Sequence, residues 1–195
     1  MNTLVDDYLY SFNTTNIDNI SLYKKCLAIE KVIFNTTPAV PKGVYGNQST
    51  ARHNYYNIFT FPVTEINQLY KHIVDNINPI LDKNTNYVLK GWLNVYRTGE
   101  NIDWHDHWPA NAKVWHGFYC VGVEEQPSAT LYKIPNIPEI EVPSKDGLLV
   151  VGKSENDLHK STVWTGKKPR ITIAFDIVPI PSINFNTNTY SYIQL

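Results

Sequence analysis

The sequence has few cysteines and no long apolar run, and each shortage excludes a class of protein. Its two cysteines, Cys26 and Cys120, have neither the spacing of a disulfide framework nor that of a zinc ribbon. We expect both to be reduced, buried thiols. No apolar run approaches the roughly 18 residues that a membrane span needs, so we predict no membrane partner.

Basic residues are also scarce, because only three arginines occur and the formal net charge is -1. No window gathers the lysine and arginine density that phosphate backbones require, so we expect no nucleic acid partner. Residues 1–10 include Asp6 and Asp7 and lack the basic and apolar regions of a signal peptide. We therefore predict a cytoplasmic protein. Abundant asparagine, lysine and isoleucine with little arginine indicate AT-rich coding DNA, as in a phage whose protein acts in the host cytoplasm.

Two helices are predicted in the first half of the chain. The first covers residues 21–32, and Asp18 or Ser21 can cap its start. The second begins with Thr64 as its cap and stops at Pro79. Its apolar residues recur at helical spacing: Ile66, Leu69, Tyr70, Ile73, Val74 and Ile77.

Short runs dense in valine, isoleucine and aromatic residues replace this pattern in the second half, and they predict β-strands. Between the two helices, residues 37–54 are rich in proline, glycine, asparagine and serine, and predict a long loop. Eight closely spaced strands are typical of a double-sheet jelly roll. The predicted strands are 87–96, 103–107, 113–123, 130–134, 139–142, 147–151, 158–164 and 170–178.

A single domain of 195 residues is expected, since no repeat or linker divides the chain. The predicted fold class is mostly β with flanking helices, a double-stranded β-helix. Residues 1–86 would form a helical and loop support packed outside the barrel, residues 87–180 the jelly-roll core, and residues 181–195 a C-terminal tail.

Three of the six histidines lie within twelve residues, as His105, His107 and His116. Residues two apart in a strand project to the same face, so His105 and His107 would point together into the barrel. Imidazole suits divalent iron, zinc, copper and nickel, and a third ligand from another strand would leave open coordination positions. His116 is expected to face substrate or a neighbouring strand.

The third ligand is predicted to be His159, which follows the apolar run of residues 147–151. Arg170 comes eleven residues later and begins another predicted strand, and Thr172 would lie on the same face of that strand. A guanidinium and a hydroxyl can together bind a carboxylate inside the barrel.

Five segments follow one another along the second half of the chain: Trp92 to Gly99, His105-x-His107, the strand from Gly117 to Val123, the stretch from Gly147 to Val151, and His159 followed by Arg170-x-Thr172. In this order they resemble the segments of 2-oxoglutarate-Fe(II) oxygenases. The resemblance covers residues 87–180 and is nearest to the small oxygenases common in bacteria and marine phages, with a more distant likeness to prolyl 4-hydroxylases.

The resemblance implies that His105, His107 and His159 hold Fe(II), and that Arg170 and Thr172 bind the far carboxylate of 2-oxoglutarate. Oxidative decarboxylation with dioxygen would then yield succinate and CO2 and hydroxylate a protein side chain or a small molecule. By position, Tyr96 and Tyr119 resemble tyrosines that line the cosubstrate pocket in prolyl hydroxylases.

One departure concerns the second ligand, because most members of the wider superfamily carry His-x-Asp or His-x-Glu where this chain has His-x-His. A carboxylate would cancel one unit of the charge of the iron, whereas three neutral imidazoles would not. Asp103, also two residues from His105, is the reserve candidate for a carboxylate ligand.

Two other functions fit parts of the pattern. A cupin-like metalloenzyme also uses several histidines, but it has no need of Arg170 and Thr172. A non-enzymatic jelly-roll binding or virion-associated module would carry its histidines incidentally, and would neither take up iron nor respond to 2-oxoglutarate.

Overall fold

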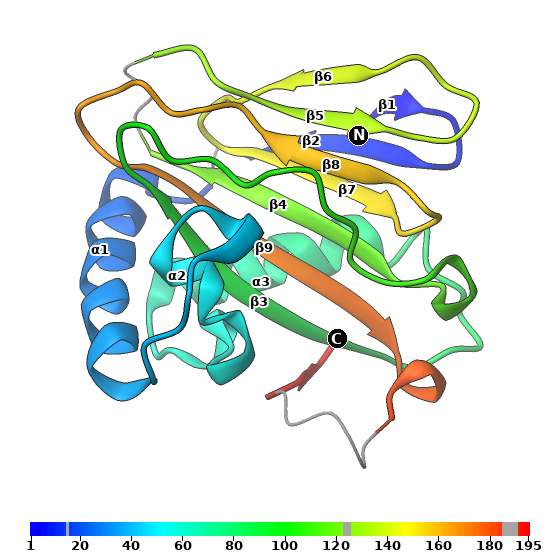
Figure 1. Cartoon of the computed structure of the whole chain (residues 1–195). Helices are drawn as coiled ribbons and strands as arrows, with labels where there is room; N and C mark the ends of the chain where they lie inside the picture. Colours follow the sequence, from blue (N-terminus) through cyan, green and yellow to red (C-terminus); the bar gives the residue numbers. More distant parts are fainter. Residues whose placement is uncertain (15, 123–125, 185–190) are drawn as a thin grey trace.

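The structure is a computed structural model that describes residues 1–14, 16–122, 126–184 and 191–195. The strands within these residues are β1 (Asn2–Val5), β2 (Leu9–Asn13), β3 (Tyr87–Tyr96), β4 (Trp115–Val121), β5 (Ala129–Lys133), β6 (Ile140–Pro143), β7 (Leu148–Lys153), β8 (Leu158–Ser161), β9 (Arg170–Pro179) and β10 (Ile193–Gln194). They form two antiparallel sheets, with the order β1-β2-β7-β4-β9-β3-β10 in the larger and β6-β5-β8 in the smaller (Figure 1). The predicted jelly-roll class is confirmed.

One predicted strand is wrong, because residues 103–107 pair with a neighbour only at a single bridge between His105 and His159. Two main-chain hydrogen bonds of 3.1 and 3.0 Å make this bridge. Asp103, two residues earlier, donates its N–H to Val44 O instead. Residues only two apart in this segment thus hydrogen-bond to different partners, so no continuous ladder of strand pairing forms. The predicted strand 113–123 is shorter as β4, and Val123 lies outside the described residues.

The larger sheet also takes strands from both ends of the chain, which the predicted division at residues 87 and 180 missed. β2 pairs with β7 from Leu9 opposite Gly152 to Asn13 opposite Leu148, and β1 pairs with β2. β10 pairs with β3 near the C-terminus. The first 86 residues are therefore part of the jelly roll as well as its support.

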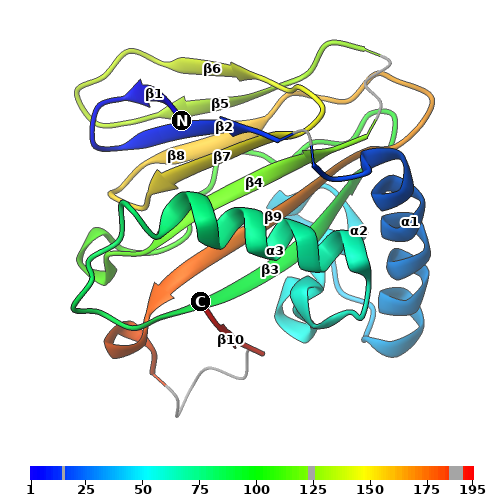
Figure 2. The same cartoon turned by 180° about the vertical axis from the view of Figure 1, so that it is seen from behind.

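Both predicted helices are present, as α1 (Asn19–Thr36) and α3 (Thr64–Ile77). Asp18 caps α1 by accepting a hydrogen bond from the Ser21 N–H, whereas no side chain caps α3 and Val63 occupies its N-cap position. Figure 2 shows α3 crossing the back of the larger sheet beside α1. The predicted loop 37–54 is partly helical. Within it lie α2 (Gln48–Ala51) and the 3-10 turn Gly43–Tyr45, and the 3-10 turn His53–Tyr55 begins near its end. Other 3-10 turns are Ile58–Thr60, Ala110–Ala112 and Ile180–Ser182.

None of the helices in the described part of the chain is both long and apolar enough to cross a membrane. Cys26 and Cys120 are reduced, buried thiols, as predicted. The cytoplasmic location and the phage source stay predictions.

Strand alternation divides the larger sheet into two chemically different faces. On β9, the residues between Arg170 and Asp176 alternate, with the even-numbered ones lining a cavity. The odd-numbered ones, such as Ile173 and Phe175, are buried in one apolar cluster with residues of α1 and α3. The helices thus shield one face with hydrocarbon, and polar side chains collect on the other.

Candidate metal centre

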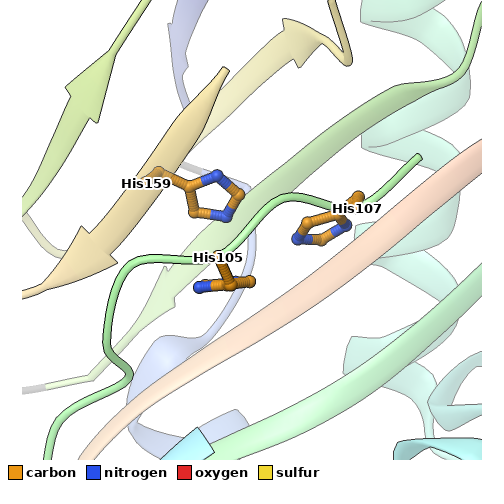
Figure 3. Close-up of side chains that lie close together, drawn as sticks. All are labelled: His105, His107 and His159. Atoms are coloured by element: carbon orange, nitrogen blue, oxygen red, sulfur yellow. The ribbon is translucent and has the colours of Figure 1, made fainter. Parts of the chain in front are cut away.

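Three histidines converge at one point between the two sheets (Figure 3). His105 and His107 come from the irregular segment before β4, and His159 comes from β8. Ring centroids lie 4.3 Å apart for His105 and His159, 4.9 Å for His107 and His159, and 5.5 Å for His105 and His107. One ring nitrogen from each histidine lies within 4.8 Å of the others. The predicted ligand set is therefore assembled, although the segment that carries two of its members is not a strand.

Each imidazole directs its Nδ1 atom towards an oxygen and so leaves Nε2 available. His105 Nδ1 lies 2.7 Å from the main-chain oxygen of Asp103, which can only accept. His107 Nδ1 lies 2.6 Å from Asp176 Oδ1, and His159 Nδ1 lies 3.5 Å from Asp157 Oδ2. A proton on Nδ1 leaves the Nε2 lone pair free to bind a metal. The residues therefore fit a divalent cation.

Asp103, the reserve ligand, is exposed, and its carboxylate accepts from the Trp104 N–H at 2.8 Å. It does not belong to either group of converging metal-ligand atoms among the described residues. The second group consists of His116, Asp157 and His159. His116 is a fourth buried imidazole, and its ring centroid lies 4.8 Å from that of His107.

The surroundings shift the pKa values of the three candidate ligands in different directions. Burial, reinforced by the neighbouring His107, lowers the pKa of His105 to about 4. Burial also holds the pKa of His159 well below its ordinary value. Burial acts the same way on His107, but the charge and hydrogen bond of Asp176 outweigh it and raise the pKa of this imidazole. Of the three candidate ligands, His107 is therefore the one that keeps its proton to the highest pH.

Metal affinity is therefore expected to fall as pH decreases through neutrality. A base with a raised pKa keeps its proton to higher pH, so proton competition at His107 begins above the ordinary histidine value of about 6.5. His105, with its pKa near 4, adds no competition until much lower pH. Cobalt(II) titration at several pH values around neutrality should show an affinity that falls as the pH is lowered, with proton release on binding. An affinity that is constant over this range would contradict the assignment.

A cavity of about 290 Å³ opens beside the histidines, between the larger and the smaller sheet. Arg170 contributes to its lining and is 4% exposed. Its Nη2 donates to Ser144 Oγ at 2.8 Å, and its guanidinium lies 4.9 Å from the ring centroid of Tyr96. Arg170 Nε and Nη1 have no acceptor among the described residues. Because buried donors without acceptors are costly, the site is suited to an anionic ligand.

Thr172 lies next along the same face of β9 and also lines the cavity. Asn94, its register partner on β3, donates from Nδ2 to Thr172 Oγ1 at 3.0 Å. Thr50 donates in turn to Asn94 Oδ1 at 2.6 Å. This chain of hydrogen bonds orients the hydroxyl beside Arg170.

The two predicted pocket tyrosines have different positions. Tyr96 lines the cavity beneath Arg170, as expected. Tyr119 does not line it, and its hydroxyl donates to Asn19 Oδ1 at 2.8 Å at the start of α1. The reason is alternation on β4, because His116 and Phe118 face the cavity and Tyr119 must face the opposite side. The expected pocket role of Tyr119 is corrected accordingly.

Two carboxylates beside the histidines, Asp157 and Asp176, were missed in the sequence. Asp176 could have been found, because it is six residues after Arg170 and so lies on the same face of the strand. Asp157 precedes β8, where alternation gives no rule for its side chain.

No family model matches the sequence, and no curated protein matches it either. Solved structures, in contrast, do match the fold of this chain. A prolyl hydroxylase of Trichoplax adhaerens, in complex with a hypoxia inducible factor peptide fragment, superposes with a TM-score of 0.65 at 11% identity, covering 91% of this chain and 86% of its own. A member of the 2OG-Fe(II) oxygenase family from Burkholderia pseudomallei gives 0.55 at 9% identity, covering 89% and 85%.

The chain has the fold of the 2-oxoglutarate-Fe(II) oxygenases. A non-heme alpha ketoglutarate dependent epimerase, SnoN of nogalamycin biosynthesis, shares this oxygenase fold, with a TM-score of 0.61 at 12% identity over 88% of this chain and 77% of its own. Five of the residues that carried the resemblance meet in one cavity: His105, His107 and His159 at one position, and Arg170 with Thr172 at another.

Proposed function

We propose that the protein is an Fe(II)- and 2-oxoglutarate-dependent oxygenase that hydroxylates a small molecule or a protein side chain and releases succinate and CO2. One observation carries the proposal: three convergent imidazoles share a cavity with a buried guanidinium, two of whose nitrogens have no acceptor among the described residues. A dicarboxylic 2-oxo acid has a metal-binding end and a distant carboxylate, and so complements both.

The residues divide the work as follows. His105, His107 and His159 hold the iron, which when bound supplies the oxidative chemistry. Arg170 binds the far carboxylate through its planar fork, and Thr172 adds a hydroxyl from the same face of β9. The protein thereby fixes the cosubstrate in one orientation before dioxygen is consumed.

The remaining cavity wall provides a place for the substrate. Tyr45 and His53, from the region 37–54, line the cavity together with Trp92 and Trp108. Tyr45 and His53 are in edge contact, with ring centroids 5.2 Å apart, and His53 lies 5.7 Å from Trp92. This aromatic wall is suited to exclude water and to contact an apolar part of the substrate.

Both substrate classes are compatible with the fold. Among the similar structures, one is in complex with a peptide fragment and another is an epimerase of nogalamycin biosynthesis. Because enzymes with different substrates share one fold, both classes belong in the substrate panel of the test.

The test is anaerobic reconstitution with Fe(II), followed by addition of dioxygen and measurement of succinate against a panel of peptides and small molecules. We expect succinate formation that requires both iron and 2-oxoglutarate and that increases with a true substrate. Iron binding without any response to 2-oxoglutarate would favour the cupin-like metalloenzyme. A chain that takes up no iron, and whose melting temperature is insensitive to 2-oxoglutarate, would favour a binding module.

A further inference from the structure

Two buried carboxylates contact the histidine set from outside it. Asp176 lies on β9, and its Oδ1 atom is 2.6 Å from His107 Nδ1. Its other oxygen accepts from Trp108 Nε1 at 2.9 Å, so both oxygens are engaged and the carboxylate is held in one orientation. The side chains of His107 and Asp176 are only 8% and 12% exposed, which strengthens the electrostatic coupling between them.

Asp157 lies beside His159 in a looser contact, at ion-pair distance and without a hydrogen bond between the two side chains. Its Oδ2 atom lies 3.5 Å from His159 Nδ1 and 3.1 Å from His116 Nε2. The rings of His116 and His159 stack at 4.8 Å with an interplanar angle of 15°. Asp157 is 1% exposed, so its charge acts in a region that water does not screen.

Charge balance connects these carboxylates to the His-x-His sequence. Burying two anions is costly unless cations compensate them. Lys90, in register with Asp176 across β3 and β9, is one positive group that acts on this carboxylate. A divalent ion bound by the three imidazoles would supply the other compensating charge, because neutral imidazole ligands contribute no negative charge themselves.

We propose that Asp176 and Asp157 supply, through His107 and His159, the negative charge that a ligand carboxylate would otherwise provide directly to the metal. A carboxylate that accepts the Nδ1–H of a ligand imidazole makes Nε2 a stronger donor and fixes the ring. Both are positioning residues in this proposal, since neither belongs to the ligand set His105, His107 and His159. The inference rests on the metal centre of the proposed function but does not require 2-oxoglutarate.

A double-mutant cycle with cobalt(II) as the probe tests the inference. Asp176→Asn in the wild-type chain is expected to lower cobalt affinity by about ten- to a hundredfold. His107→Asp places a carboxylate at the ligand position itself. In that background Asp176→Asn should cause no loss, or even a gain, because two adjacent carboxylates repel each other. Asp106→Asn is the matched control, since it removes an exposed charge between the two ligands and should cost less than about fivefold.

A loss of the same factor in both backgrounds would reduce Asp176 to a structural role and overturn the inference, as would no loss in the wild-type chain. Far-UV circular dichroism and apo melting temperature verify folding of each variant. If His107→Asp does not fold, Asp157→Asn provides the second arm, with a similar expected loss and a shifted cobalt absorption spectrum; unchanged affinity and spectrum would overturn the inference. A wild-type chain that binds cobalt but not 2-oxoglutarate overturns the proposed function alone, whereas one that binds no cobalt overturns both.

Discussion

Replacement of Arg170 by lysine is expected to weaken 2-oxoglutarate binding by about ten- to a hundredfold while iron stoichiometry stays the same. Lysine keeps the charge but loses the planar fork and its bidentate hydrogen bonding. A charge-assisted hydrogen bond contributes on the order of 1.5–3 kcal/mol, and this range corresponds to the stated loss in affinity. The measurement is iron content and 2-oxoglutarate titration on the same anaerobic sample.

Arg97→Lys is the matched control for this experiment. Arg97 is about half exposed and bonds through both terminal nitrogens to Glu30, and it does not line the cavity. The same substitution there should leave 2-oxoglutarate affinity unchanged. Unaltered binding in both Arg170→Lys and Arg170→Ala would refute the cosubstrate role and make the cupin-like metalloenzyme the better hypothesis.

Removal of any one of the three histidines is expected to have the largest effect on metal content. Each alanine variant loses an entire ligand, so cobalt or iron affinity should fall by more than about a hundredfold, the upper end of what loss of an outer-sphere partner costs. Metal per chain after dialysis is the measurement. His72→Ala is the matched control, because His72 lies on α3 and forms its contact with Asn76 there.

The ligand assignment has a specific alternative in Asp103. Full metal occupancy in His107→Ala together with metal loss in Asp103→Ala would exchange the two assignments. The exposed position of Asp103 and its local bond to the Trp104 N–H lead us to expect full occupancy in Asp103→Ala.

Local pattern in the sequence was enough to predict the two core strands and the three histidines that converge. β3 has the predicted bounds of residues 87–96, and β9 begins at Arg170 as predicted. Alternation along β9 determines that Arg170 and Thr172 share a face, and helical spacing determines which face of α3 is buried. These features depend on residues close together in the chain, so a single sequence determines them.

Only the tertiary structure decided which distant segments meet. The pairing of β2 with β7 depends on contacts between residues 9–13 and 148–152, for which the apolar pattern specifies no partner. Alternation predicts that two residues share a face but not which face lines the cavity, and Tyr119 was misplaced for this reason. His105 and His107 reach His159 through one main-chain bridge between otherwise unpaired segments, and Asp157 and Asp176 gain their importance only once that bridge brings them beside the ligands.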